Sequence, residues 1–186
     1  MSTGTSAVLT GAPITATGGL LFGDLTVALP IDATTALDPA WIKGGYIGED
    51  GVTRTTDASD DKIKAWGGDT VKIVRTEHSI TYTFTFMESA NAAVLKLIHG
   101  ESNVVVAGSK VTVKHTSQMP ARKAYVLDMK DEPAAIREVI PDGQITTSGD
   151  VVFVHSDVIR YEVSIEAFPD EDGVKAISYM DDGSTP

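Results

Sequence analysis

The chain has 186 residues, 42% of them hydrophobic, which is enough for one large domain or two small ones with a proper core. Its net charge of −11 argues against a conventional nucleic-acid-binding surface, which needs lysine and arginine to displace counterions. The absence of cysteine excludes disulfides and thiolate metal sites. The first basic residue is Lys43, and no stretch approaches the ~20 apolar residues of a membrane span. We therefore expect neither a secretory signal nor contact with a membrane.

The N-terminal third reads as an arm, a short strand and a long loop. Residues 1–18 are uncharged and rich in Ser, Thr, Gly and Ala, as in an extended arm or simple terminal disorder. A strand is expected over 19–29, followed by turn residues at 30–39. The segment 41–68 has both tryptophans near its ends and many Gly and Asp residues between them. This pattern predicts a long, packed loop, either functional or simply pinned to its own core by the tryptophans.

The stretch 70–87 is the clearest strand of the chain. Its even positions from Val74 onward become apolar and aromatic, while the odd positions stay polar and rich in threonine. This period of two is typical of a half-buried β-strand, and the run is long compared with the usual ~5–6 residues. Val71 and Ile73 are apolar at odd positions, so the phase changes, which predicts a bulge near Ile73 and Val74.

A single helix is expected over 89–99, with Ser89 as N-cap and Gly100 in the left-handed conformation after its end. Its apolar stripe comprises Ala90, Val94, Leu97 and Ile98. The remaining strands are expected at 104–115 (a hairpin around Gly108), 122–130, 158–167 and 174–180, with turns at 142–143 and 148–149. The prediction is a mainly β domain over 19–180 with one helix, followed by a short acidic tail at 181–186.

No motif of enzymatic chemistry stands out. The four histidines lack a metal-ligand spacing such as H-E-x-x-H, and there is no G-x-S-x-G nucleophile elbow. Glu162 and Glu166 share one polar strand face, for which solvation is the default. We expect no catalytic residue, no cofactor and no metal site.

Four blocks together resemble the major tail protein, or tail tube protein, of long non-contractile-tailed bacteriophages, especially those of actinobacteria. The blocks are TALDPAWIKGGYIGEDGVT (35–53), IKAWGGDTVKIVRTEHSITYTFTFMES (63–89), NAAVLKLIHG (91–100) and DVIRYEVSIEAFPDEDGVKAISYM (157–180). The resemblance covers residues 19–180 and is weaker over 107–152. It rests on the order, spacing and composition of the blocks.

The resemblance implies a structural virion protein and no enzyme. A β-sandwich with a flanking helix would form hexameric rings, and sheets of six subunits would join edge to edge into an inner barrel. Stacked rings would make the tail tube through which DNA is ejected into the host. The implied partners are further copies of the chain, a tape-measure protein, the tail terminator, baseplate or tip proteins, and double-stranded DNA that passes without specific binding. Assembly would take place in the host cytoplasm.

The resemblance also implies two sets of contact residues. A lumen-facing set is expected from the polar strand faces: Glu77, Ser79, Thr81, Thr83, Thr85, Glu162, Ser164 and Glu166. The alternative for this set is the outer, solvated face of an ordinary sandwich. An inter-ring set is expected in the long loop 41–68: Trp41, Tyr46, Asp57, Asp60, Asp61 and Trp66.

Two other functions remain open at this point. An all-β binding or adhesion module, for carbohydrate or protein, would use Trp41, Tyr46 and Trp66 as an aromatic platform. A β-sandwich hydrolase would need clustered carboxylates in a cleft.

Overall fold

The structure is a computed structural model that describes residues 8–183, apart from the side chains of residues 147 and 148. Its strands are β1 (Ala12–Pro13), β2 (Leu20–Gly23), β3 (Ile42–Lys43), β4 (Ile47–Lys64), β5 (Thr70–Phe86), β6 (Val104–Ala107), β7 (Lys110–Val113), β8 (Lys123–Asp131), β9 (Ala134–Ser148), β10 (Tyr161–Ala167) and β11 (Ile177–Asp181). An α-helix, α1 (Ala92–His99), and a 3₁₀ helix, η2 (Glu101–Asn103), lie between β5 and β6. The predicted fold class, mainly β with one α-helix, is confirmed for the described residues.

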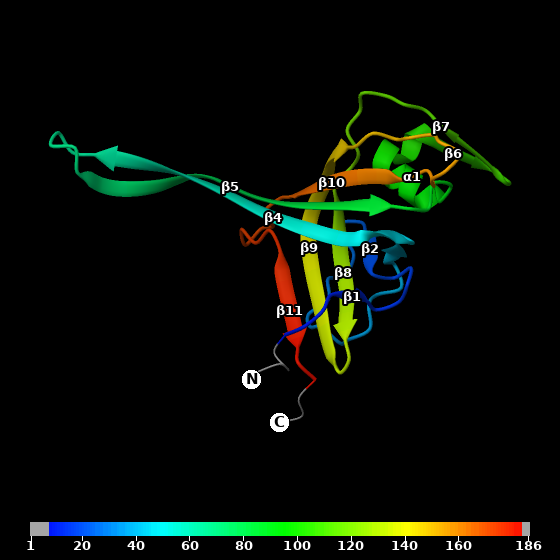
Figure 1. Ribbon diagram of the computed structural model, residues 1–186, viewed down its shortest axis with the longest axis horizontal. Coiled ribbons are helices and arrows are strands. Elements are labelled where there is room, and N and C mark those ends of the chain that lie inside the picture. Colours follow the sequence, from blue (N-terminus) through cyan, green and yellow to red (C-terminus); the bar gives the residue numbers. More distant parts are fainter. Residues whose placement is uncertain (1–7, 184–186) are drawn as a thin grey trace.

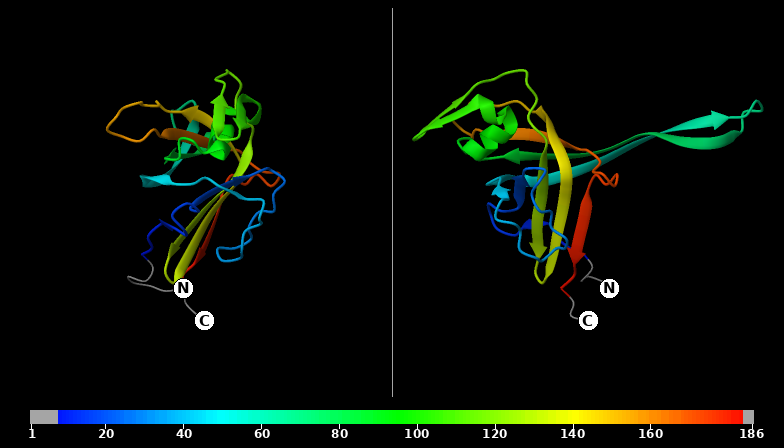
Figure 2. Two further views of the ribbon diagram at one scale, coloured as in Figure 1. Left: turned by 90° about the vertical axis from the view of Figure 1, so that its right-hand side faces the viewer. Right: turned by 180° about the vertical axis from the view of Figure 1, so that it is seen from behind.

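Nine of the described strands form one antiparallel sheet in the order β3-β2-β8-β9-β10-β5-β4, with β1 beside β8 and β11 beside β9. The hairpin β6–β7 is separate. The sheet bends at β9, because residues 134–143 pair with β8 whereas residues 143–148 pair with β10. Figures 1 and 2 show β8, β9 and β11 running at a steep angle to β5 and β10. The two parts of the sheet therefore enclose an interior like the layers of a sandwich.

The main core lies between these two parts and under α1. It contains buried side chains from both parts of the sheet and from the helix: Leu20, Phe22, Tyr82, Phe84, Phe86, Val94, Leu97, Ile98, Tyr125, Leu127, Ile140, Ile145, Val163, Ile165 and Ala167. The even positions of β5 thus face the interior, as their apolar character predicted. Burial of such aromatic and branched side chains supplies most of the driving force for folding.

A second, smaller cluster covers the other face of β8. It contains Leu21, Trp41, Ala124, Val126 and Val139. As a result, residues 124–128 of β8 are all buried, so both faces of this strand are covered there. The cover is provided by the chain before β3, which the buried guanidinium of Arg137 holds through bonds from Nη1 to the carbonyl oxygens of Asp32 (3.0 Å) and Thr35 (2.8 Å).

The helix packs as predicted through Val94, Leu97 and Ile98, but it starts later than expected. Its N-cap is Asn91, whose Oδ1 accepts a hydrogen bond from the Ala93 amide at 3.0 Å. Asn91 is an effective cap because its short side chain reaches the free amides of the first turn. Ser89 precedes the helix, and Gly100 ends it with a positive φ of 92°.

The predicted turn at 142–143 is wrong, because both residues lie inside β9. The sequence Pro-Asp-Gly is instead a bulge: Lys123 pairs with Gly143 and Tyr125 with Ile140, which leaves one extra residue in β9. Proline without an amide hydrogen tolerates such a position. Gly143 is needed because a Cβ there would lie 2.8 Å from Cγ2 of Ile165.

Three other strands are shorter than predicted. The first strand, β2, stops at Gly23 because the chain turns at Asp24, whose carbonyl accepts the Val27 amide at 3.0 Å. Strand β10 begins only at Tyr161, and β11 begins at Ile177. The hairpin around Gly108 is present as β6–β7.

The largest difference concerns residues 41–68, which were expected to form an irregular loop. Residues 47–64 are instead the strand β4, which pairs antiparallel with nearly the whole of β5. The resulting hairpin projects far beyond the body of the protein (Figure 1). Beyond Thr53 both faces of β4 are exposed, so polar residues occupy both and no period of two marks the strand.

The bulge expected near Ile73 and Val74 is also misplaced, because both residues pair regularly with β4. The extra residues of β5 are Thr76, between the pairs Ser59–Glu77 and Asp60–Arg75, and Val71. The bulge at Thr76 nevertheless explains the change of phase. It places Ile73 on the same side of the ribbon as the even positions beyond it.

Candidate functional site

The predicted polar residues of β5 and β10 come together on one face of the sheet. Thr81, Thr83 and Thr85 lie directly opposite Glu166, Ser164 and Glu162, respectively. The Thr81 hydroxyl donates to Oε2 of Glu166 at 3.0 Å, and the hydroxyls of Thr83 and Ser164 are 3.1 Å apart. Cross-strand contacts of this kind stabilise a sheet modestly and fix the orientation of its side chains.

Strand β4 extends this polar surface by a third row that sequence reasoning missed. Its members lie opposite the predicted residues of β5, in the pairs Thr53–Thr83, Thr55–Thr81, Asp57–Ser79 and Ser59–Glu77. We call the three rows together the polar face: residues 53, 55, 57 and 59 of β4, residues 77, 79, 81, 83 and 85 of β5, and residues 162, 164 and 166 of β10. This part of β4 is polar at nearly all successive positions (TRTTDAS), so no signal in the sequence separates this row from the opposite face of the strand.

All the charged side chains of the polar face are negative. Its ionisable side chains are the carboxylates of Asp57, Glu77, Glu162 and Glu166, and it contains no lysine or arginine. Behind it, Tyr82, Phe84, Phe86, Val163, Ile165 and Ala167 are buried in the main core. The sheet therefore separates an apolar interior from a hydroxyl-rich, anionic surface.

The residues predicted to anchor the long loop do not meet. Trp41 is buried in the smaller cluster, and its Nε1 donates to the Ala28 carbonyl at 3.3 Å. Tyr46 is half exposed before β4, whereas Trp66 is fully exposed in the turn between β4 and β5. The aromatic platform expected for a binding module is thus not formed.

The acidic group of this segment is also spread along β4 rather than gathered in a turn. Asp57 belongs to the polar face. Asp60 forms an exposed ion pair with Arg75 (Oδ1 to Nε, 2.9 Å), and this hydrogen bond lowers the pKa of Asp60. Asp61 lies opposite Val74.

A cleft of about 770 Å³ opens on the opposite side of β4, away from the polar face. Its walls are mostly apolar and come from the N-terminal segment, the start of β4, and β8, β9 and β11: among them Leu20, Ile47, Val52, Leu127, Met129, Ile136 and Met180. Glu49 and Asp50 also line it. Sequence reasoning did not find this cleft, because its walls come from six segments spread along the sequence: the N-terminal segment and parts of β4, β5, β8, β9 and β11.

A polar network joins the two parts of the sheet inside this cleft. Glu138 of β9, almost fully buried, accepts from Nη1 of Arg54 (2.7 Å) and from the Tyr82 hydroxyl (2.6 Å), and Ser178 also donates to it. The carboxylate raises the pKa of Arg54, and burial, together with Glu138, raises the pKa of Tyr82 well above its ordinary value. The network fixes the base of the long hairpin to β9 and β11.

The described residues offer no metal-binding group of three or more histidine, cysteine or acidic side chains. His99 of α1 and His115 contact each other edge to face, with ring centroids 4.8 Å apart. Among residues 8–183, no helix is both long and apolar enough to cross a membrane.

Comparison with known proteins decides the family. The sequence profile described as phage tail tube protein matches residues 1–185, which is nearly the whole chain. The chain belongs to the phage tail tube protein family. The resemblance read from its sequence is thereby confirmed, and this tail tube protein is a structural component of the virion tail and not an enzyme. No curated protein matches the chain.

Solved structures of tube-like proteins are similar to this tail tube protein only distantly. A chain of the PVC sheath–tube complex, an extracellular contractile injection system in its extended state, is 10% identical, with 95% of this chain and 98% of that chain covered and a TM-score of 0.48. A chain of the anti-feeding prophage cap, described as the tube-terminating cap, is 6% identical, with 94% and 95% covered and a TM-score of 0.49.

Proposed function

We propose that this tail tube protein forms hexameric rings that stack into a hollow tube, with the polar face lining the bore through which double-stranded DNA passes into the host. The observation that carries the proposal is the continuity of the polar face across β4, β5 and β10, backed by a fully apolar core. In a closed barrel, alternate residues face the interior and the packed layer outside. The polar face matches the first of these surfaces.

The edges of the sheet support closure between copies. Strand β4 is the last strand in the sheet order, and residues 144–148 of β9 pair with β10 on one side. An edge as long as β4 is an aggregation hazard unless another strand covers it. We expect β4 of one copy to pair with residues 144–148 of the next, so that six copies close a ring and remove both edges.

The charge of the polar face suits a conduit. Protein surfaces that bind DNA release counterions by placing lysine and arginine on phosphates, and none lies on this face. Its four carboxylates repel the phosphate backbone, while its hydroxyls keep the wall hydrated. DNA would then slide along the bore without being held.

The long hairpin, rather than a loop, is the proposed contact between rings. Its distal half leaves the body of the subunit entirely (Figure 1). A tape-measure protein in the bore, a terminator and baseplate proteins at the two ends, and assembly in the host cytoplasm complete the proposal.

Microscopy of the purified protein is the first test. At high concentration, negative-stain images should contain rings and tubes with a central hole. A protein that remains monomeric under all conditions would contradict the proposal.

The bore assignment has a sharper test in phage particles. Replacing Thr81, Thr83 and Thr85 by lysine should leave tubes intact but strongly reduce DNA delivery, because the new cations bind phosphate. The matched control places the same three charges at the exposed residues Thr10, Thr26 and Thr112. Equal infectivity of the two variants would show that the polar face does not line the bore.

A further inference from the structure

The distal half of the long hairpin lacks a partner within its own subunit. All residues from Thr55 to Glu77 are exposed, on both faces of the ribbon. A two-stranded ribbon is at best marginally stable alone in water. It needs further strands, or another element packed against one face, to be stable. Large apolar side chains are nevertheless present there and are exposed: Ile63, Trp66, Val71, Ile73 and Val74.

The tip of the hairpin, residues 62–72, combines this apolar surface with positive charge. It carries Lys62, Lys64 and Lys72 against Asp69, a net charge of +2 in a chain whose total is −11. Trp66 stands at its end in the turn between the strands. Tryptophan is among the residues that most often act as anchors in protein interfaces, and the lysines beside it favour a partner surface that carries carboxylates.

The cleft beneath β4 has the complementary character. Its walls are largely apolar, and Glu49 and Asp50 lie at the start of β4 within its lining. At about 770 Å³ it falls in the range of ~300–1,000 Å³ typical of concave binding sites. The size of the cleft and the two carboxylates in its lining are therefore compatible with an apolar anchor flanked by lysines.

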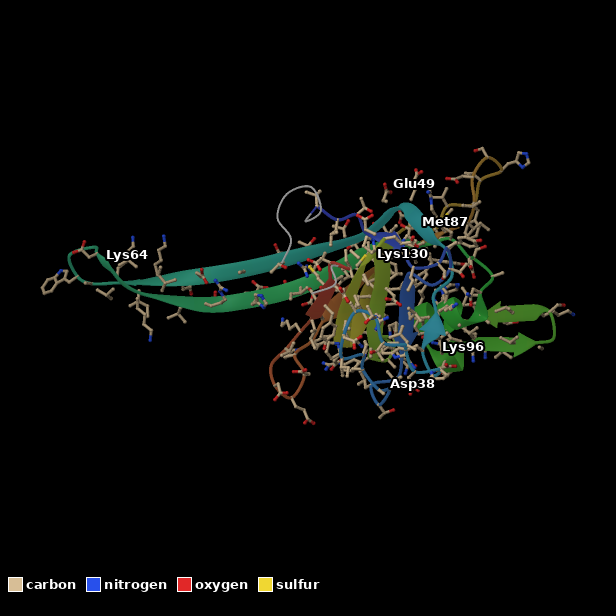
Figure 3. All side chains as sticks on the ribbon, turned by 90° about the horizontal axis from the view of Figure 1, so that it is seen from below. Asp38, Glu49, Lys64, Met87, Lys96 and Lys130 are labelled. Atoms are coloured by element: carbon tan, nitrogen blue, oxygen red, sulfur yellow. The ribbon has the colours of Figure 1, made fainter. Side chains whose placement is uncertain are left out.

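The tip cannot reach the cleft of its own subunit. Glu49 and Lys64 lie on the same strand, 15 residues apart, which corresponds to about 50 Å at ~3.3 Å per residue. Figure 3 shows the two side chains at opposite ends of the hairpin, with Glu49 beside the body and Lys64 at the far end. Any contact between tip and cleft must join two copies of the chain.

We propose that the Trp66-bearing tip of one copy docks in the cleft of another copy, with Lys62 and Lys64 beside Glu49 and Asp50. The contact is heterologous, because two different surfaces meet, and such contacts propagate from copy to copy. It rests on the proposed tube and names the surface that receives the hairpin. The distance of about 50 Å between the tip and the cleft of one subunit would then determine the spacing between the clefts of two copies in contact.

The absence of native cysteine makes a direct test possible. One copy carries Gly67→Cys, next to Trp66 and with open space around a new Cβ, and a second, size-tagged copy carries Met180→Cys at the exposed rim of the cleft. The two are mixed, assembled and treated with a short bismaleimide. The control replaces the second variant by Met119→Cys, which is also exposed but lies outside the cleft.

The expected result is a cross-linked pair between residues 67 and 180 in tubes, with none to residue 119. Assembled tubes that cross-link residue 67 to neither position would overturn the docking site and leave the tube proposal standing. A wild-type chain that forms no tubes would overturn both.

Two further measurements test the chemistry of the contact. Because Trp41 is already buried, a blue shift of tryptophan fluorescence on assembly reports Trp66, and it should vanish in Trp66→Phe. Lys62→Glu with Lys64→Glu should lower tube yield about tenfold or more. Adding Glu49→Lys and Asp50→Lys to that variant should restore the yield. No rescue, with no blue shift in the wild type, would overturn the proposal.

Discussion

The two halves of β5 have the same backbone and both contain apolar side chains, yet their surroundings are opposite. Near the body, Tyr82, Phe84 and Phe86 are at most 3% exposed, whereas Val71 and Ile73 in the distal half are 62% and 58% exposed. The near half has a second layer, formed by β2, β8 and α1, and the distal half has only β4. Apolar residues on a strand therefore indicate a surface that becomes buried. They do not indicate whether the same chain or another molecule buries it.

The largest expected effect comes from truncating the near half. Phe86→Ala removes a fully buried ring that contacts Phe84 edge to face at 5.0 Å between centroids, and should lower the free energy of unfolding by about 3–5 kcal/mol. Ile73→Ala in the distal half should change it by about 0.5 kcal/mol or less in the monomer. Urea denaturation measures both, and equal effects would contradict the contrast.

The junction between the halves should show an intermediate effect. Glu138→Gln keeps the size of the side chain but weakens its bonds with Arg54 and Tyr82, and should cost about 1–3 kcal/mol. The matched control is Asp60→Asn, which removes the exposed partner of Arg75 in the distal half. No measurable change is expected there, since exposed pairs contribute little. A control as damaging as Glu138→Gln would show that the distal half is not independent.

Removing the distal half altogether should separate folding from assembly. Ala58 and His78 lie directly opposite each other, so residues 59–77 can be replaced by an Asn-Gly turn, which suits a two-residue hairpin. The free energy of unfolding of the monomer should change by about 1 kcal/mol or less, because the deleted residues are exposed. Tubes should no longer form in negative-stain images. If the shortened chain still polymerises, the hairpin does not connect rings.

The smallest effect concerns pH and the contact between His99 and His115. Burial, and then the neighbouring His115, lower the pKa of His99 below its ordinary value of 6.5. The folded state then binds fewer protons than the unfolded state, so stability should decline as the pH falls through about 6.5 and level off below the folded pKa. Thermal unfolding between about pH 7.5 and 5.5 measures this slope.

Two variants check the source of this slope. His115→Gln should reduce the decline, because it removes the neighbouring charge and leaves the burial of His99. His155→Gln, at an exposed site outside the contact, should leave the decline unchanged. A slope that is the same in all three proteins would exclude the His99–His115 contact as its source.

Much of the structure around the near half of β5 was predictable from sequence. Burial of one face of a strand or helix imposes a periodic pattern of apolar residues. The alternation of residues 80–86 and 161–167 identified two strands, the polar positions of both, and which side of each strand faces the core. The pairing of Thr81 with Glu166 was not predictable, because a single sequence does not reveal which strands are neighbours in the sheet. The helix was found for the same reason, although Asn91 rather than Ser89 caps it.

The remainder was not predictable because the deciding contacts are long-range. Strand β4 shows no period of two, and its Gly51 and Asp residues are typical of turns, so only pairing with β5 makes it a strand. Pro141, Asp142 and Gly143 have turn composition but form a bulge, since β8 and β10 both hold the chain extended there. Trp41 and Trp66 are chemically identical, and nothing local reveals that one is buried and the other fully exposed.

The strand β9 determines the register of both parts of the sheet. Its first part is paired with β8 and β11 and its last part with β10, so the same 15 residues set the alignment of both parts of the sheet. A slip of β9 by one residue would turn every one of its side chains to the opposite side. It would pull Glu138 out of its network and misalign β10 beside Thr81, Thr83 and Thr85 at the same moment. If the polar face lines the bore as proposed, a subunit with this error would lack a continuous polar face and should not be incorporated into the tube.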